Sequence, residues 1–194
     1  MQRYIRQILF AAVLFLSSTA VFAADRIAVI DLEKVFRNYY KSRIAEETIN
    51  QRGDAIRNYL AQLDAQLTAL RQEANKLAMN ASNLALTEAD RIKAKNAAIE
   101  ARKKVKAKET EIELFVSENR REIKELENKK RTEIMADIQR AVSRRATAEG
   151  YNFVIDRSGK TLNGQPAVIF YPAKNDITDA VLRELNRTAV KPKN

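Results

Sequence analysis

The chain has 194 residues, of which 31% are charged, and its excess of lysine and arginine gives a formal net charge of +10. It contains neither histidine nor cysteine, so the commonest general base, the thiol nucleophile, disulfide bonds and the usual zinc ligands are all missing. We therefore expect no enzyme activity, no cofactor and no metal, whereas the basic charge favours acidic proteins, anionic membrane surfaces or nucleic acid as partners.

The first 23 residues have the pattern of a secretory signal peptide. Arg3 and Arg6 precede an apolar run over residues 8–16, and the small residue Ala23 stands at the expected cleavage position. The run is shorter than the roughly 20 residues that span a bilayer, which disfavours the alternative of an uncleaved anchor. We expect export with cleavage after Ala23, and export makes nucleic acid the least favoured partner.

Residues 25–149 contain no proline and only one glycine, Gly53, and these two residue types are the ones that interrupt helices. Apolar residues in the first half alternate steps of four and three, which is the spacing of a coiled-coil seam: Ile56, Leu60, Leu63, Leu67, Leu70, Ala74 and Leu77. Polar residues at 80–83 then predict a turn, and Thr87 predicts the start of a second helix. We expect an antiparallel helical hairpin whose second helix covers residues 88–149 and ends at Gly150.

The second helix has a thinner apolar seam because charged residues interrupt it. The expected seam residues are Ala89, Ile92, Ile99, Val105, Ile112, Val116, Ile123, Leu126, Ile134, Ile138, Ala141 and Val142. A basic run on this helix supplies candidate contacts for acidic proteins or anionic lipid, at Arg102, Lys103, Lys104, Lys106 and Lys108. An ordinary solvated helix face is the favoured interpretation of this run, since charged residues cover most exposed helix surfaces.

Three short segments with β character flank the hairpin, over residues 26–30, 151–155 and 167–171. Their successive apolar residues predict strands that are buried on both faces, and residues 156–166 predict a hairpin connection between the last two. Asp176 is expected to cap a short helix with an inward face made of Ile177, Val181, Leu182 and Leu185, followed by a tail over residues 186–194.

So few elements cannot cover a sheet on both faces. We therefore expect an α+β chain in which a small β-sheet body carries the helical hairpin and associates with further copies through the sheet. The residues expected in that contact are Ile27, Val29, Phe153, Ile155, Val168 and Phe170.

Two other groups of side chains receive a structural interpretation. Asp31 and Asp156 could form a pair of catalytic carboxylates, but each follows a strand next to basic residues, which favours capping or ion pairing. Phe36, Tyr39 and Tyr40 could contact a partner, but apolar side chains at helical spacing more often pack where two elements meet.

Three sequence segments, in this order, resemble the Skp (OmpH-like) family of periplasmic chaperones. They are Ala-Asp-Arg-Ile-Ala-Val-Ile-Asp over residues 24–31 with Val35 and Phe36 behind it, Tyr-Asn-Phe-Val-Ile-Asp over residues 151–156, and Asp-Ile-Thr-Asp-Ala-Val-Leu-Arg-Glu-Leu over residues 176–185. The resemblance covers the whole mature chain. It implies a body made of residues 24–36 and 150–185 and an arm made of residues 37–149, with its tip near residues 80–87.

In that family three subunits share a β-barrel body, and their three arms enclose unfolded outer-membrane proteins without using ATP. The resemblance therefore implies a periplasmic homotrimer that holds such proteins and prevents their aggregation. It assigns no lipopolysaccharide site to the basic run on the second helix, so an anionic lipid or lipopolysaccharide surface stays a candidate partner. A structural coiled-coil adaptor of the cell envelope, without client binding, is the alternative from another functional class.

Overall fold

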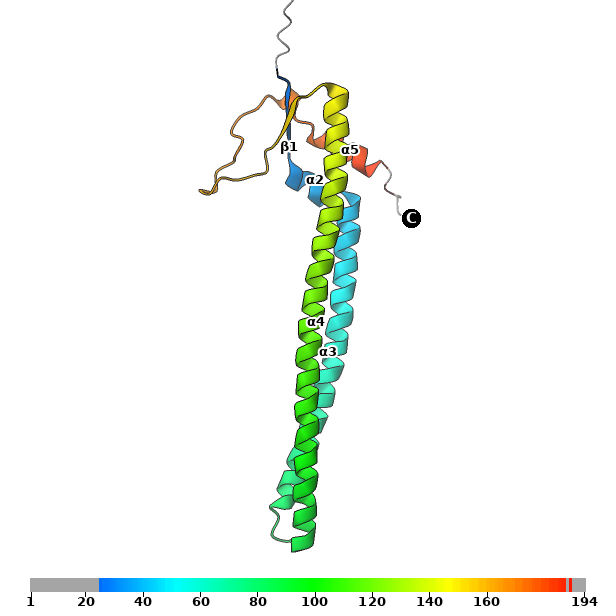
Figure 1. Ribbon diagram of the computed structural model, residues 1–194, viewed down its shortest axis with the longest axis vertical. Coiled ribbons are helices and arrows are strands. Elements are labelled where there is room, and N and C mark those ends of the chain that lie inside the picture. Colours follow the sequence, from blue (N-terminus) through cyan, green and yellow to red (C-terminus); the bar gives the residue numbers. More distant parts are fainter. Residues whose placement is uncertain (1–24, 188, 190–194) are drawn as a thin grey trace, which may run out of the picture.

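The computed structural model describes residues 25–187 and residue 189. The predicted signal peptide and its cleavage site lie outside these residues, as does most of the predicted tail. Figure 1 shows a small body from which one long pair of antiparallel helices extends. The fold class expected from the sequence, a small sheet with a long helical hairpin, is confirmed for the single chain.

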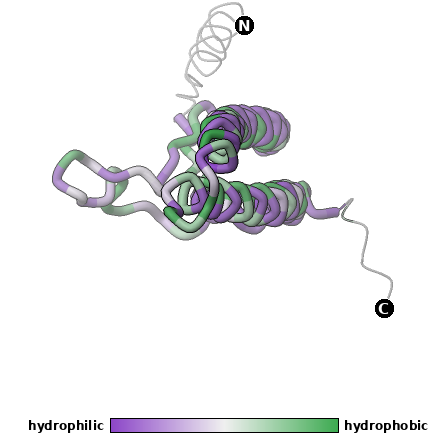
Figure 2. The backbone as a smooth tube through the Cα atoms, turned by 90° about the horizontal axis from the view of Figure 1, so that it is seen from below, coloured by the Kyte–Doolittle hydropathy of each residue, from purple (hydrophilic) through white to green (hydrophobic). Residues whose placement is uncertain are grey.

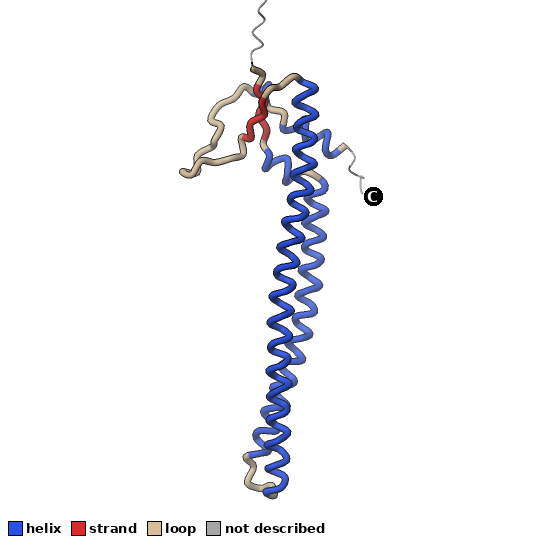
Figure 3. Tube along the Cα trace, viewed as in Figure 1, coloured by secondary structure: helices blue, strands red, loops and turns tan. Residues whose placement is uncertain are grey.

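The body contains a sheet of two parallel strands, β1 (Ile27–Ile30) and β2 (Phe153–Asp156), which are the only strands among the described residues (Figure 3). Their register pairs Ile27 with Phe153 and Val29 with Ile155. The expectation of burial on both faces holds for β1, where residues 28–30 are at most 3% exposed. In β2 the Phe153 and Ile155 side chains are 57% and 44% exposed in the single chain, so the burial of β2 on both faces stays a prediction for the oligomer.

The predicted third strand over residues 167–171 is absent from this chain. The segment that leads to it makes a single antiparallel bridge, between Lys160 and Pro166, and residues 167–171 have no regular structure. A strand needs a neighbour for its backbone hydrogen bonds, and among the described residues this segment makes only one such bond, from the Ala167 amide to the Gly159 carbonyl at 2.9 Å. The predicted hairpin is therefore reduced to a turn at the end of a long loop.

The arm consists of α3 (Tyr40–Ala81) and α4 (Glu88–Glu149), with 42 and 62 residues. Both predicted boundaries of α4 are confirmed. The Thr87 hydroxyl accepts a hydrogen bond from the Asp90 amide, and Gly150 ends the helix in the left-handed conformation with φ of 68°. At about 1.5 Å per residue, α4 is about 90 Å long.

The seam of α3 lies where the sequence predicts it, with Leu63, Leu67 and Ala74 buried and the other predicted members half-buried. The seam of α4 is partly mispredicted, because Ala89, Ile92, Ile99 and Val116 are exposed. Other residues take inward positions in their place, namely Ala94, Ala98, Ala101, Lys108, Phe115 and Asn119, whereas the predicted Val105 and Ile112 are half-buried. Figure 2 shows the consequence, since hydrophilic colour covers most of both arm helices.

The main hydrophobic core lies where the sheet meets the base of the arm. It combines β1 with the short helix α2 (Leu32–Asn38), the end of α4 and the C-terminal helix α5 (Thr178–Asn186). A 3₁₀ turn, η1 (Ala173–Asn175), leads into α5. As predicted, Ile177, Val181 and Leu185 face inward and are buried, with Leu182 half-buried.

Candidate functional site

One face of the sheet is left largely uncovered by the rest of the chain. Side chains alternate between the two sides of a strand, and Ala28 and Ile30 point into the main core. The register then places Ile27, Phe153 and Ile155 together on the opposite side, where each is at least 39% exposed. Val29 belongs to the same side by its position but is only 3% exposed, so the chain covers the face at this position.

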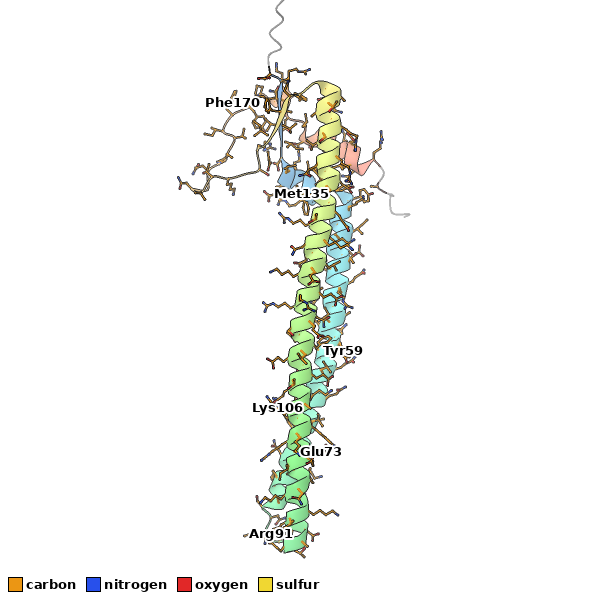
Figure 4. The ribbon with its side chains drawn as sticks, in the orientation of Figure 1. Tyr59, Glu73, Arg91, Lys106, Met135 and Phe170 are labelled. Atoms are coloured by element: carbon orange, nitrogen blue, oxygen red, sulfur yellow. The ribbon has the colours of Figure 1, made fainter. Side chains whose placement is uncertain are left out.

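The loop after β2 carries more exposed apolar side chains and extends away from the body (Figure 1). Leu162 is fully exposed, Ile169 and Phe170 are 91% and 84% exposed, and Val168 is half-buried. Figure 4 places Phe170 beside the two strands. Exposed apolar patches of this kind mark contact surfaces, and five of the six predicted contact residues are at least partly accessible here.

The arm exposes apolar side chains at intervals along its whole length. They are separated by charged residues and do not form one continuous stripe in either helix: Ile44, Tyr59, Met79, Leu84, Leu86, Ile92, Ile99, Leu114 and Val116. The Tyr59 ring packs on Phe115 of the facing helix, with 5.0 Å between ring centroids. The arm therefore offers scattered, small apolar contacts on a largely charged surface.

The basic run on α4 does not form one uniform patch. Arg102, Lys103, Lys104 and Lys106 are exposed to solvent. Lys108 instead lies in the seam between the two helices, where its Nζ donates to Gln66 Oε1 at 3.0 Å and its side chain is 18% exposed. Four of the five predicted cations are thus accessible to a partner, although Lys103 lies 2.8 Å from Glu100 and Lys106 3.9 Å from Glu109, and the fifth connects the arm helices.

The carboxylates considered for catalysis are used in the structure of the body. Asp31 caps α2 by accepting from the Lys34 amide at 2.7 Å, and its other oxygen lies 3.1 Å from the Arg157 guanidinium. The same guanidinium is 3.4 Å from Asp176. Capping and ion pairing, the favoured interpretation, therefore account for Asp31. Among residues 25–187 and 189, no group of three or more acidic side chains is placed to hold a metal ion.

Asp156 and Asp176 bind backbone amides and hydroxyls near the ends of the strands. Burial alone would raise the pKa of each carboxyl, but hydrogen bonds outweigh this effect and lower the pKa of both. Asp156 accepts from the Ser158 hydroxyl and amide at 2.7 and 2.9 Å and from the Leu32 amide at 3.1 Å. Asp176 accepts from the Thr178 amide at 2.9 Å.

These lowered pKa values predict that the body loses stability in acid. A carboxyl with a depressed pKa in the folded state stabilises the fold fully above its unfolded pKa, about 3.9 for aspartate, and loses that contribution as pH falls through the folded pKa. We expect the melting temperature to fall below about pH 4 and the Asp156→Asn variant to show a shallower fall. Thermal unfolding followed by circular dichroism at several pH values measures this.

Asp64→Asn, on the exposed surface of the arm, is the matched control for this substitution. It should leave the acid dependence of the parent protein unchanged. An equally steep acid dependence in Asp156→Asn and in the parent would contradict the role given to Asp156.

The aromatic residues at the base of the arm pack as expected. Tyr39 is 3% exposed within the main core, and Phe36 and Tyr40 pack against that core. Sequence reasoning missed the polar partners of this junction, Asp137 and Asn186. Asp137 bonds Tyr39, 98 positions away, and Asn186 bonds Tyr40, 146 positions away. No local pattern in the sequence indicates such a pairing.

The described residues form a small α+β body whose sheet has a largely uncovered apolar face. The body carries a long two-helix arm with few apolar residues on its surface. These features define a class of arm-bearing proteins. None of the helices in the described part of the chain has the length and apolar character needed to cross a membrane. The chain belongs to the OmpH-like outer membrane protein family, whose model matches residues 26–185.

Individual relatives agree with this assignment. The chain is 28% identical over 169 residues to "Chaperone protein Skp" of Pectobacterium atrosepticum, a match that covers 87% of this chain and 90% of the relative. It is 27% identical over 172 residues to "Chaperone protein Skp" of Yersinia enterocolitica, with 89% and 93% covered. A crystal structure of an OmpH-like protein from Caulobacter crescentus CB15 has the same fold, with a TM-score of 0.66 at 15% identity and 89% and 90% coverage.

Proposed function

We propose that this protein is an ATP-independent holdase chaperone of the periplasm. Its subunits form a homotrimer through the uncovered sheet face, and their arms enclose unfolded outer-membrane proteins and prevent their aggregation. The observation that carries this proposal is the pairing of a long, sparsely apolar arm with a small body, in a chain whose relatives over nearly their full length are named as chaperones.

The surface chemistry of the arm suits the holding of unfolded chains. An unfolded membrane β-barrel exposes alternating apolar side chains and unpaired strand edges, which are the groups that aggregate. Many scattered contacts, such as those of Tyr59, Leu114 and Val116, bind weakly one by one and together give avidity. Each contact can therefore release quickly while the client stays enclosed.

The body supports association of subunits. Ile27, Phe153 and Ile155 leave an apolar face in water, and residues 167–171 have β-forming side chains without a strand partner. Neighbouring copies would cover the face and supply the missing partner for residues 167–171. Association of subunits would therefore both bury the exposed apolar face and pair the unpaired segment.

A denatured outer-membrane β-barrel, diluted into buffer with and without the mature protein, tests the proposed function. We expect the protein to suppress the rise in light scattering in the absence of ATP. A rise equal to that of the client alone would reject the holdase function and favour the structural adaptor.

The four exposed cations of the basic run are proposed to attract acidic clients and anionic lipid or lipopolysaccharide. Replacing Arg102, Lys103, Lys104 and Lys106 together by glutamine should weaken binding of an acidic client and flatten its salt dependence, because screening acts only on charged contacts. Binding titrations at low and high salt measure this. The control variant changes Arg120, Arg121, Lys124 and Lys129 to glutamine, and an equal effect in both variants would indicate net charge rather than a local site.

A further inference from the structure

The path from the body into the arm is interrupted on one side only. Helix α4 runs through the junction without a break, whereas α2 ends at Asn38 and α3 begins at Tyr40. Between them Tyr39 has extended backbone angles, φ of −73° and ψ of 129°. A helix start leaves its first amides without partners in the helix, and a helix end leaves its last carbonyls open, so the break needs donors and acceptors from elsewhere.

One side chain serves both sides of this break. The Oδ1 atom of Asn186 accepts from the Tyr40 amide at 2.9 Å, and its Nδ2 atom donates to the Asn38 carbonyl at 3.0 Å. Only an amide side chain offers an acceptor and a donor in this arrangement. Asn186 therefore replaces hydrogen bonds that an unbroken helix would make with its own backbone.

Asn186 is itself held firmly by the body. It is the last residue of α5, whose Thr178, Val181 and Leu185 are at most 8% exposed in the core. Two residues earlier, Glu184 accepts two hydrogen bonds from Arg144 of α4 at 2.7 and 2.9 Å. The position of Asn186 is thus fixed relative to both the sheet and the continuous helix.

A second contact connects the break to the continuous helix. The buried Tyr39 hydroxyl donates to Asp137 of α4 at 3.1 Å, and Lys41 donates to the same carboxylate oxygen at 2.6 Å. This contact joins the two arm helices to one another but not to the body. Tyr40 and Ala45 of α3 pack on the main core, and Asn186 adds a hydrogen bond from the body to the backbone at the start of α3.

We propose that Asn186 is a positioning residue for the arm, which fixes the direction in which α3 leaves the body by bonding both backbone groups at the break. Two helices that are both anchored resist bending together, whereas an arm whose α3 has lost its hydrogen bond to the body keeps only apolar packing there and can bend and twist more about α4. The space between arms in the proposed chaperone would depend on this direction, and only that consequence rests on the proposed function.

Distances measured within one subunit test the role of Asn186 without any client. The chain lacks cysteine, so spin labels can be attached at Asn58→Cys on α3 and Lys174→Cys in the body, both exposed positions. Labelled protein is refolded with an excess of unlabelled protein so that distances between subunits do not contribute. In Asn186→Ala we expect a clearly broader distance distribution, and hydrogen exchange in peptides covering residues 39–46 about tenfold faster.

Two further variants keep the outcome interpretable. Asn186→Asp retains an acceptor for the Tyr40 amide and loses the donor to Asn38, so its distribution should fall between those of the parent and the alanine variant. Arg183→Ala changes an exposed residue of the same helix and should match the parent. A folded Asn186→Ala with the parental distance distribution would overturn the proposal, as would equal broadening in Arg183→Ala.

Discussion

Replacing Phe153 by glutamate is expected to dissociate the oligomer while leaving the subunit folded. Phe153 lies on the uncovered sheet face and is 57% exposed in the single chain, so its ring can be changed without opening the main core. In an assembly through this face the side chain would be buried, and the glutamate would lose its hydration without gaining a partner. Light scattering after size-exclusion chromatography should give the mass of one subunit.

The expected size of this effect follows from the surface involved. Full burial of a phenylalanine contributes about 1.5–3 kcal/mol, and roughly half of that remains to be gained on association. Loss of this contribution and the cost of burying a carboxylate together exceed about 3 kcal/mol, which weakens each contact about a hundredfold or more. Ile155 beside it, 44% exposed, gives the same prediction with a smaller magnitude.

Gln139→Glu is the matched control, because it adds the same charge at an exposed position of α4 away from the sheet face. It should retain the mass of the parent oligomer. A parent protein that is itself a stable monomer would contradict the shared sheet, and so would a Phe153→Glu variant that keeps the parental mass.

The long helices were predictable because their signals are local. The absence of proline, the alternating spacing from Ile56 to Leu77, the Thr87 cap and Gly150 each act within a few residues, and the structure has the corresponding elements. The seam of α4 was less predictable, since Ala98 and Lys108 take inward positions that a search for large apolar residues overlooks. A long lysine side chain can cover apolar surface with its stem and still bond through its tip.

The prediction of a third strand was wrong for the single chain, and for a different physical reason. Residues 167–171 have strand propensity, but propensity alone does not supply a hydrogen-bonding neighbour. In the single subunit the segment stays irregular, with Ile169 and Phe170 exposed. The same consideration applies to Asn186, whose role depends on a helix break nearly 150 positions away and is set by tertiary structure alone.

Shortening the arm is expected to abolish client holding while leaving the oligomer intact. The cut must lie beyond the junction, because Ala45, Ile134 and Ile138 of the arm helices belong to the main core. Residues 55 and 119 face one another at one level of the hairpin, as the pairing of Tyr59 with Phe115 and of Arg52 with Glu122 indicates. Residues 56–118 can therefore be replaced by a polar linker of about four residues, a usual length for such helix connections.

The shortened protein distinguishes the role of the body in assembly from the role of the arm in client binding. It keeps the sheet face, the core and the Arg52–Glu122 ion pair, so its mass per subunit should give the same oligomeric state as the parent. It loses most of the exposed apolar residues of the arm, from Tyr59 to Val116, and with them the multiple contacts that give avidity. We expect no suppression of light scattering by a diluted outer-membrane β-barrel, at any ratio of protein to client.

The same linker placed at residues 83–86 is the control, since it changes the tip and preserves the length of both helices. This variant should suppress aggregation nearly as well as the parent. If the shortened protein still holds the client, the binding surface belongs to the body and the arm is a spacer. If it no longer forms the oligomer, the arms contribute to assembly, and the uncovered sheet face alone does not account for it.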